Sequence, residues 1–575
     1  MKLRRVQIER FRGIRQLDWT LGGGFICLVG PGDSTKTTIL DAVDLALSPR
    51  WNIPFDDSDF FDARVDEPIV ISVTIGDLPQ RHKSENAYGY LARGWSASGE
   101  CHDEPEDGDE LVLSVQLRVD SSLEPSWAVV NERNPEGRSI SAKDRELLGC
   151  VRLGEFIDRH FSWGRGSVLS RLTAAPEGLS HVLAEAARAA RGALADGPEK
   201  LANLRHASDA ARRAGSEFGV AASSEYRPHL DVQAVSVGIG GLSLHDGEVP
   251  LRRAGLGTRR LLAVAIQREV ARDGGITLID EIEHGIEPHR VRRLVRVLRG
   301  CGGEPSSQRH VLMTTHSPVV LAELDVTEVR VVRSINGVTE VRQVDPAIQP
   351  ILLKNSEAFL ARKVLVCEGK TEIGLCRRLD EWWSENGLPS FGLSGVALAD
   401  GGGRAAPNIA RAFAQVGYDV ALLGDSDVPL DPDAAALESM GVHVVLWGDG
   451  MALEERIVQD LPWHGVAEVV SLAMESYTEE GVRDAIRARL DRSTTDLAGL
   501  PDDWQALDLA EGSLRAAIGL AAKKHKAEKG REGWFKRVSL AQELASIVIR
   551  HFDAVVTLDL GRKICSLRGW AHGDG

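Results

Sequence analysis

An apolar strand, a glycine turn and the start of a helix follow one another without a gap in FICLVGPGDSTKTTILDAV. A strand that enters a helix in this way turns backbone N–H groups toward one point, where the helix dipole favours an anion. We expect Gly30 and Gly32 to permit the tight turn. Lys36 supplies positive charge for phosphates, and Thr37, followed by Thr38, offers a hydroxyl for Mg²⁺. The segment therefore predicts an α/β fold with a phosphate-binding loop.

One position departs from the usual pattern of such loops. Thr35 stands where a glycine normally precedes the lysine. A Cβ beside the phosphates leaves nucleotide binding possible but puts rapid hydrolysis in question. A chance match in an ordinary loop is the alternative, and the flanking strand and helix argue against it.

A second group of polar residues follows about 240 positions later, where the strand of TLIDEIEHGIEPHR ends in two acids. Asp280 is expected to hold the Mg²⁺ shell and Glu281 to polarise the attacking water, as phosphoryl transfer requires. Further on, His316 ends the strand of LMTTHSP and is placed to sense the γ-phosphate. The plain alternatives are a solvated acidic turn and a structural histidine.

Length, charge and cysteine content limit the classes of protein that remain. A chain of 575 residues predicts two or three domains, and no apolar stretch is long enough to cross a bilayer. With no signal peptide in view, we expect a cytoplasmic protein. Seven scattered cysteines without C-x-x-C spacing argue against disulfides and structural zinc. A net charge of −16 means that any nucleic-acid binding must use local basic patches.

The order of segments predicts one nucleotide-binding α/β domain, formed by residues 1–150 and 231–345 and interrupted by an insertion. Residues 151–230 are rich in Ala, Leu and Arg and helix-like, so they predict either an internal helical hairpin or a dimerisation arm. Residues near 340–357 are linker-like. A second α/β unit is expected over 358–575.

That second unit carries paired carboxylates where two strands end. Glu368 and Glu372 surround the strand-to-helix turn of KVLVCEGKTEIGLC, and Asp425 and Asp427 follow the strand of GYDVALLGDSDVP. The carboxyl ends of adjacent parallel strands face one crevice. Gathered carboxylates suit one or two Mg²⁺ or Mn²⁺ ions, which activate water. We therefore expect a metal site at this edge.

Two further acids are candidates for the same site. WGDGMALEERI contains Glu454 and Glu455 near a strand end, and we expect Glu454 to complete the metal shell. Asp400, which precedes GGGR, is expected to serve only its own turn.

A basic segment, KKHKAEKGREGWFKR, follows the second unit's core, with Trp534 and Phe535 inserted among eight basic residues and two acids. Such a segment predicts a surface that grips phosphates, and one lysine is expected to steady the charge that develops during cleavage. A solvated helix is the alternative. The helix HRVRRLVRVLR is a second basic surface, for which packing and solvation suffice.

The first half of the chain resembles the ATPase heads of chromosome-maintenance and recombination proteins, including the RecF type. The resemblance rests on ERFRGI, the loop near residue 30, and RRAGLGTRRLL with Gly255 and Gly257 before a helix. It implies an ABC-type head that binds ATP, with two heads of a dimer enclosing two nucleotides. Arg12 would then lie near the nucleotide; the alternative is a surface arginine.

The second half resembles the Toprim domain of primases, topoisomerases and nucleases, and the combination of both halves resembles the OLD (overcoming lysogenization defect) nuclease family, which includes the nuclease subunit of the Gabija antiphage system. The resemblance covers nearly the whole chain. It implies that Glu368 and Lys536 act in DNA cleavage, with Lys536 preferred to Lys529 as the family lysine. It also implies a homodimer, and a UvrD-like helicase as partner for a Gabija-like protein.

The sequence thus predicts an ATP-regulated, metal-dependent DNA endonuclease, and the resemblance to the OLD family implies a role in antiphage defence. A DNA-binding ATPase clamp or sensor without nuclease activity is the alternative, and the intact carboxylates argue against it. A topoisomerase would need a further domain with a nucleophilic tyrosine. Cleavage of RNA stays open.

Overall fold

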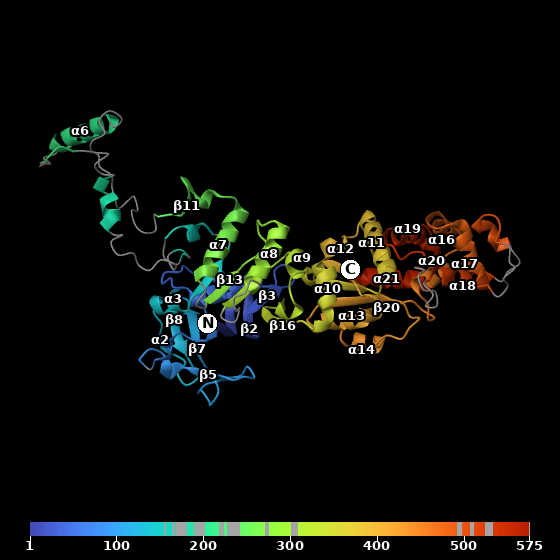
Figure 1. Ribbon diagram of the computed structural model, residues 1–575, viewed down its shortest axis with the longest axis horizontal. Coiled ribbons are helices and arrows are strands. Elements are labelled where there is room, and N and C mark those ends of the chain that lie inside the picture. The colour runs from blue at the N-terminus through green and yellow to red at the C-terminus, as the bar shows by residue number, and fades with distance from the viewer. Residues whose placement is uncertain are drawn as a thin grey trace. The chain divides into compact units, whose positions relative to one another are not determined.

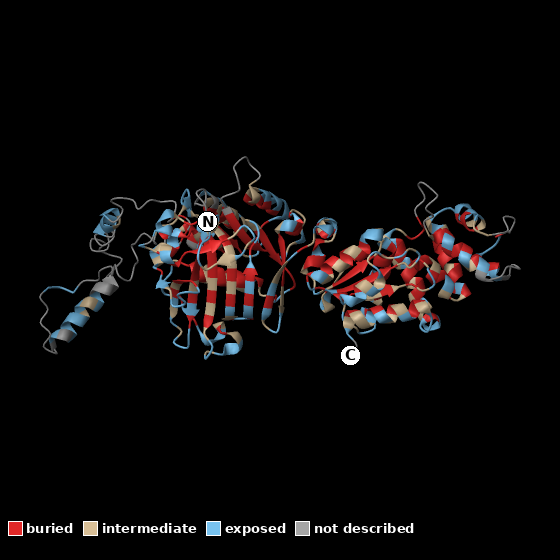
Figure 2. Ribbon diagram, turned by 90° about the horizontal axis from the view of Figure 1, so that it is seen from below, coloured by how far each residue is buried: buried red, intermediate tan, exposed pale blue. Residues whose placement is uncertain are grey.

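The structure is a computed structural model, and it describes residues 1–84, 86–154, 157–163, 167, 169, 181–186, 188–189, 202–217, 224–226, 242–270, 275–300, 309–490, 497–506, 511–523 and 533–573. The chain forms two compact units. Unit 1 holds Met1–Phe25 and Thr37–Thr314, and unit 2 holds Ile26–Lys36 and Thr315–Gly575. Figure 1 labels elements of both units, and in Figure 2 strands of unit 1 alternate buried and less buried residues, while helices of both units show exposed faces.

Unit 1 combines antiparallel and parallel strands. The antiparallel part pairs β1 with β2 and β4, and β4 with β7, which also pairs with β5 and β8. The parallel part pairs β13 with β10 and β14. The strands are β1 (Lys2–Phe11), β2 (Ile14–Thr20), β4 (Ile69–Gly76), β5 (Arg93–Trp95), β6 (Cys101–His102), β7 (Glu110–Val119), β8 (Pro125–Val130), β9 (Arg138–Ser139), β10 (Cys150–Leu153), β11 (His245–Asp246), β12 (Val249–Pro250), β13 (Gly275–Ile279) and β14 (Arg309–Thr314).

Unit 1 contains the helix that the basic segment HRVRRLVRVLR predicted. The basic helix α8 (Pro288–Arg299) begins with proline at its first turn and ends at Gly300 in the left-handed conformation, which are the usual start and stop signals. Its apolar residues are buried and its arginines form the outer face. The other helices are α1 (Lys36–Leu47), α2 (Gln80–Lys83), α3 (Ala142–Leu147), α6 (Ala202–Glu217) and α7 (Leu256–Val270).

The predicted insertion begins within the sheet. Cys150–Leu153 forms β10, which pairs in parallel with β13, so the boundary expected at residue 151 falls inside a strand. Of the remaining insertion, α6 is described as a helix, as are 181–186 and 188–189. Most of the other positions lie outside the described residues, and a dimerisation role stays a prediction.

Unit 2 contains a four-stranded parallel sheet in the order β18, β17, β19, β20. These strands are β17 (Lys363–Cys367), β18 (Val396–Asp400), β19 (Asp419–Gly424) and β20 (His443–Leu446). Both β17 and β19 are almost continuously apolar, as expected for parallel strands covered on both faces. Helices α11 (Lys370–Glu385), α12 (Phe391–Ser394), α13 (Ala406–Gln415) and α14 (Ala434–Ser439) belong to this α/β part.

The rest of unit 2 comprises three more strands and further helices. β3 (Phe25–Val29) pairs in parallel with β15 (Val329–Ile335), which pairs with β16 (Val338–Gln343). The helices are α9 (Pro318–Leu321), α10 (Gln349–Lys354), α15 (Leu453–Asp460), α16 (Trp463–Ser476), α17 (Glu479–Arg487), α18 (Glu511–Ala522), α19 (Val538–Arg550), α20 (Phe552–Val555) and α21 (Asp559–His572).

The linker expected near 340–357 is instead folded. Pro346–Ile348 forms a 3₁₀ turn and Gln349–Lys354 forms α10. Ile348, Ile351 and Leu352 are buried, so apolar packing orders this segment, and the interpretation of it as a linker is wrong.

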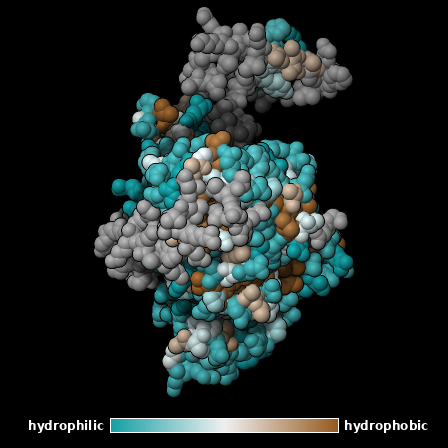
Figure 3. Space-filling view, turned by 90° about the vertical axis from the view of Figure 1, so that its right-hand side faces the viewer, coloured by the Kyte–Doolittle hydropathy of each residue, from teal (hydrophilic) through white to brown (hydrophobic). Residues whose placement is uncertain are grey.

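The face toward the viewer in Figure 3 is mostly hydrophilic, with separated apolar patches. Among the described helices, none has the length and apolar character needed to cross a membrane.

Candidate functional site: a phosphate loop and a buried carboxylate cluster

The phosphate loop lies between β3 and α1 and uses left-handed backbone at three places. Gly30 has a φ of +143°, and a Cβ there would lie 2.6 Å from the carbonyl oxygen of Val332. Asp33 and Thr35 also have positive φ, 58° and 64°. The expectation for Gly32 is wrong, because its φ is not left-handed and a Cβ there would meet nothing within 4 Å.

Thr35 therefore holds a conformation that glycine adopts more easily. The left-handed region costs an L-residue about 1–2 kcal/mol, and a β-branched side chain is poorly suited to it. Its hydroxyl donates to the Ser34 carbonyl at 2.6 Å, which ties it to the loop. The departure noted in the sequence is thus a point of backbone strain.

Lys36 is buried and turned back onto its own loop. Its Nζ donates to the carbonyl oxygens of Gly30 (3.0 Å) and Pro31 (2.7 Å) and to Ser34 Oγ (3.0 Å). The positive charge predicted for phosphates therefore lies within the loop, held by oxygen acceptors.

In unit 1, Asp280 lies just after β13 and accepts three donors. Thr37 Oγ1 donates to Oδ1 at 3.2 Å and Thr314 Oγ1 donates to it at 2.7 Å, while Arg152 Nη2 pairs with Oδ2 at 2.9 Å. Thr37 and Asp280, each expected from the sequence to serve Mg²⁺, are hydrogen-bonded to each other, and their role at Mg²⁺ stays a prediction. Sequence spacing gave no signal for Arg152 or Thr314, which come from neighbouring strands.

The other residues predicted at this site are placed as follows. Glu281 has a φ of 44°, its amide donates to Thr314 Oγ1, and its carboxylate lies 3.4 Å from His284 Nδ1. Arg260 of α7, which the sequence did not reveal, donates to the backbone oxygens of Asp280 and Glu281. Arg12 forms ion pairs with Asp41 and Asp59. His316 follows β14 and is exposed. Thr38 lies in α1 and is half-buried.

The second candidate site is a carboxylate cluster in unit 2, defined here as Glu368, Glu372, Asp425, Asp427 and Glu454. Because β17 and β19 are parallel neighbours, Glu368 and Asp425 follow adjacent strand ends, as predicted. Glu368 Oε2 accepts the Asp425 amide at 2.8 Å.

Two more members are held by helix starts. Glu372 Oε2 accepts the amide of Gly369 at 2.9 Å and so caps α11. Asp425 Oδ1 accepts the amide of Leu453 at 2.9 Å, at the start of α15. One oxygen of each carboxylate is thereby fixed by backbone.

Glu454 is the most deeply buried member, with 1% of its surface exposed. Its Oε1 accepts from Thr371 Oγ1 (3.1 Å) and pairs with Lys536 Nζ (2.9 Å). Its Oε2 is buried without a hydrogen-bond partner among the described residues. Glu455 points elsewhere, to the Ala452 amide and Lys523.

Burial and the crowding of like charges raise the pKa values of two carboxyl groups in the cluster. The pKa of Glu372 is raised to about 7, first by burial and then by the charge of Glu454, against the lowering effect of Lys536. The pKa of Asp425 is raised to about 9 by burial and by the charges of its carboxylate neighbours. The cluster therefore favours bound protons or cations.

Two lysines partly neutralise these acids. Burial lowers the pKa of Lys536, but the charges of Glu454 and Glu372 outweigh it and the pKa ends above its usual value. Lys523 pairs with Asp427 at 3.0 Å. Asp400 serves its own turn as expected, accepting the Gly402 amide at 3.0 Å.

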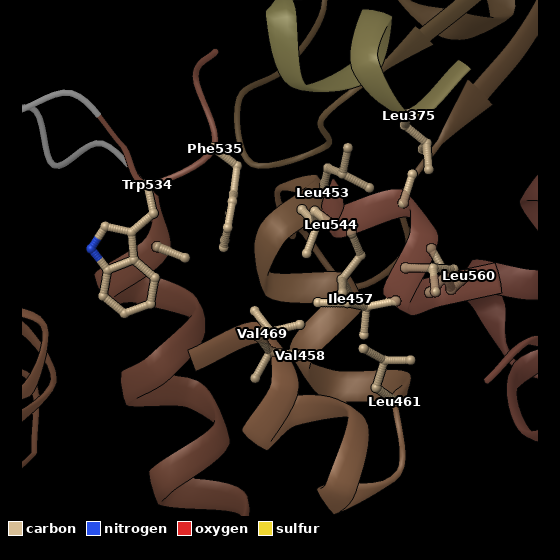
Figure 4. Packing of buried hydrophobic residues seen from close by; sticks show 14 of the residues in the cluster. Leu375, Leu453, Ile457, Val458, Leu461, Val469, Trp534, Phe535, Leu544 and Leu560 are labelled. Carbon is tan, nitrogen blue, oxygen red and sulfur yellow. The ribbon is translucent and has the colours of Figure 1, made fainter. Parts of the chain in front are cut away.

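The aromatic residues of the basic segment do not form a nucleic-acid surface. Trp534 and Phe535 are buried, 6% and 1% exposed, and pack with Leu544 of α19 and with α15 (Figure 4). They anchor the chain directly before Lys536. The interpretation of these rings as part of a phosphate grip is wrong, and residues 524–532, including Lys529, lie outside the described residues.

The donor set suits a divalent cation, although its members do not form a closed ligand shell. The cluster offers only carboxylate oxygens, the type that Mg²⁺ and Mn²⁺ prefer, and the buried Glu454 Oε2 lacks a donor. Over the described ranges, no group of three or more His, Cys, Asp or Glu side chains is arranged to hold a metal ion.

Comparisons with known proteins match parts of the chain. No curated protein matches the chain. Among solved structures, it is similar to an Smc head bound to the C-terminal winged-helix domain of ScpA (14% identity, 60% of this chain, 97% of that chain, TM-score 0.33). It is also similar to an Smc head with an extended coiled coil from Pyrococcus furiosus (13%, 62%, 99%, 0.33) and to the SMC head of Thermotoga maritima (14%, 60%, 100%, 0.29).

Residues 129–322 match the family described as "AAA domain, putative AbiEii toxin, Type IV TA system". The matched segment contains Asp280, Glu281 and His316 but not the loop at Lys36. An α/β protein with an AAA-type domain follows, and this domain implies ATP binding.

Proposed function

We propose that this protein is an ATP-regulated, metal-dependent DNA endonuclease, in which a Toprim-type site in unit 2 cleaves the phosphodiester bond. The observation that carries the proposal is the carboxylate cluster, in which the buried Glu454 Oε2 has no hydrogen-bond partner within the described part of the chain. A cluster that only stabilised the fold would not gain from burying several acids around one lysine, because desolvation exceeds what one ion pair returns.

Glu368, Glu372, Asp425, Asp427 and Glu454 are the residues that would hold the cation. The chemistry that Mg²⁺ or Mn²⁺ supplies at such a site is Lewis-acid activation of water and of the phosphodiester. Lys536, fixed by its buried aromatic neighbours, places an ammonium group against Glu454, where it can stabilise negative charge that develops on phosphate oxygens. The backbone bonds of Glu368 and Asp425 keep these side chains at the sheet edge.

ATP regulation rests on the AAA-type segment and on the phosphate loop. Lys36 donates to loop oxygens and Thr37 to Asp280, so nucleotide binding must exchange these internal bonds for bonds to phosphates and Mg²⁺. We propose that this exchange controls cleavage. A role in antiphage defence, a homodimer and a UvrD-like helicase partner rest on the OLD-family resemblance; the matched family's description names a toxin, which is compatible with defence.

Plasmid nicking with Mn²⁺ or Mg²⁺, with and without ATP, tests the proposal. Glu372→Gln should reduce nicking at least a hundredfold, whereas Glu381→Gln, on the exposed side of the same helix, should leave it unchanged. The Lys36→Ala protein should still nick the plasmid, but its nicking rate should no longer change when ATP is added. Absence of nicking by the wild-type protein under all these conditions would favour the clamp or sensor function instead.

A further inference from the structure

A pocket of 320 Å³ lies beside the carboxylate cluster in unit 2. One side of it is formed by Glu368, Asp425 and Asp427. The other side is formed by the turn between β18 and α13 and by the segment that follows β19. The pocket is therefore continuous with the proposed site of cleavage.

A turn rich in glycine places the positively charged side chain of Arg404 at this pocket. The Gly401 amide donates to the Cys367 carbonyl at 2.7 Å, and the Gly403 amide donates to the Glu368 carbonyl at 2.8 Å. A Cβ at Gly401 would lie 2.8 Å from the Cys367 carbonyl oxygen and 2.4 Å from Ala406 Cβ, so the turn can pass this close to the end of β17 and the start of α13 only without a side chain. Arg404, which follows Gly403 in this turn, lines the pocket.

Arg404 is the only lysine or arginine among the residues that line this pocket. It is exposed, and within the described part of the chain it makes no ion pair or side-chain hydrogen bond. The two lysines near the cluster differ, since Lys536 pairs with Glu454 and Lys523 with Asp427. Arg404 thus keeps its donors available for an anion from outside.

The remaining lining contains the polar residues Asn408 and Asp431 and, beside them, an apolar part that includes Pro407, Val428 and Leu430. An arginine beside apolar walls matches the two parts of a nucleotide, a charged phosphate and a flat base. We propose that this pocket receives the DNA nucleotide next to the scissile phosphodiester, with Arg404 paired to its phosphate. The inference rests on the proposed function and makes Arg404 a substrate-positioning residue.

Fluorescence anisotropy of a short labelled single-stranded DNA, with Ca²⁺ in place of Mg²⁺, tests this assignment. Arg404→Ala should weaken binding about tenfold and lower the slope of log K against log salt by about 0.7, the value for one lost phosphate contact. Arg404→Lys should recover part of the affinity and the slope. Arg562→Ala, at an exposed arginine of α21 outside the pocket, is the matched control and should change neither.

Binding by Arg404→Ala within twofold of wild type, with an unchanged salt slope, overturns the inference. If wild type cuts plasmid and Arg404→Ala cuts and binds equally well, only this inference fails. If Arg404→Ala weakens binding while wild type never cuts, the nuclease proposal fails instead. An RNA strand that shows the Arg404 dependence while DNA does not would overturn the choice of DNA.

Discussion

The acidic residues of the two candidate sites differ in how fully their charges are paired. Among the unit 1 residues at and around the predicted Mg²⁺ position, Asp280 has an arginine and two hydroxyls as partners, and Asp41 has Arg12 and Arg152. In the carboxylate cluster, several acids share Lys536 and Lys523, and the buried Glu454 Oε2 has no hydrogen-bond partner among the residues that the structure describes. In the first group, arginines already balance the charges of Asp280 and Asp41. In the cluster, the acids outnumber the lysines, so bound protons or cations must balance the remaining charge.

The largest expected effect is an opposite response of the two units to pH. Burial lowers the pKa of His310 in β14 to about 3, and both ring nitrogens lack partners among the described residues. The unfolded chain then binds more protons between pH 3 and 6.5, so the stability of the fold is highest above pH 6.5 and falls by roughly 5 kcal/mol as the pH drops through this range.

The carboxylate cluster gives unit 2 the opposite dependence of stability on pH. Because the pKa values of Glu372 and Asp425 are raised, their stabilising contribution is complete below the unfolded values near 4 and is lost as pH rises through about 7 and 9. Hydrogen-exchange protection, measured for each unit from pH 4 to 9 without divalent cations, checks both trends. His310→Leu should flatten the acid response of unit 1; an unchanged response would contradict this account.

Removing the cluster's lysine should destabilise unit 2. Lys536→Met leaves the buried Glu454 without its cation and should cost about 3 kcal/mol, measured by denaturant unfolding. The double variant Lys536→Met/Glu454→Gln should recover most of the loss. A single variant as stable as wild type would show that the cluster is already neutral and would remove the contrast.

In the phosphate loop, two glycines serve as a matched pair. Gly30→Ala should lower stability by about 2 kcal/mol and weaken ATP binding, because its Cβ would meet the Val332 carbonyl in a left-handed backbone. Gly32→Ala should change stability by less than about 0.5 kcal/mol. Thermal unfolding with and without ATP measures both, and equal effects would contradict the backbone geometry.

The smallest effect is expected at Thr35. Thr35→Gly relieves the left-handed strain but adds freedom to the unfolded chain, so the net gain should be about 0.5–1 kcal/mol. ATP turnover should rise in the same variant if the Cβ slows hydrolysis. A loss of stability would mean that the hydroxyl bond to Ser34 outweighs the strain.

Much of this arrangement follows from local sequence patterns. The strand that precedes each acid could be predicted because parallel strands are apolar throughout, and the places of Glu368 and Asp425 followed from the strand ends. The partners Arg152, Arg260 and Arg404 could not be predicted, since each reaches its site through tertiary packing.

The errors have physical causes as well. Trp534 and Phe535 lie between charged residues, but their large apolar area is buried in the core. Gly32 was taken as a turn glycine from spacing alone, whereas the left-handed positions are Gly30, Asp33 and Thr35. Composition suggested a linker where Ile351 and Leu352 pack.

Isothermal titration of the protein with Mn²⁺ at pH 7, in buffers of different ionisation enthalpy, tests the central claim that the cluster is a cation site. Binding should release protons from the acids whose pKa values are raised, and Glu454→Gln should weaken it at least tenfold. Binding without proton release, or equal binding by Glu454→Gln, would contradict the assignment of the cluster as the cation site.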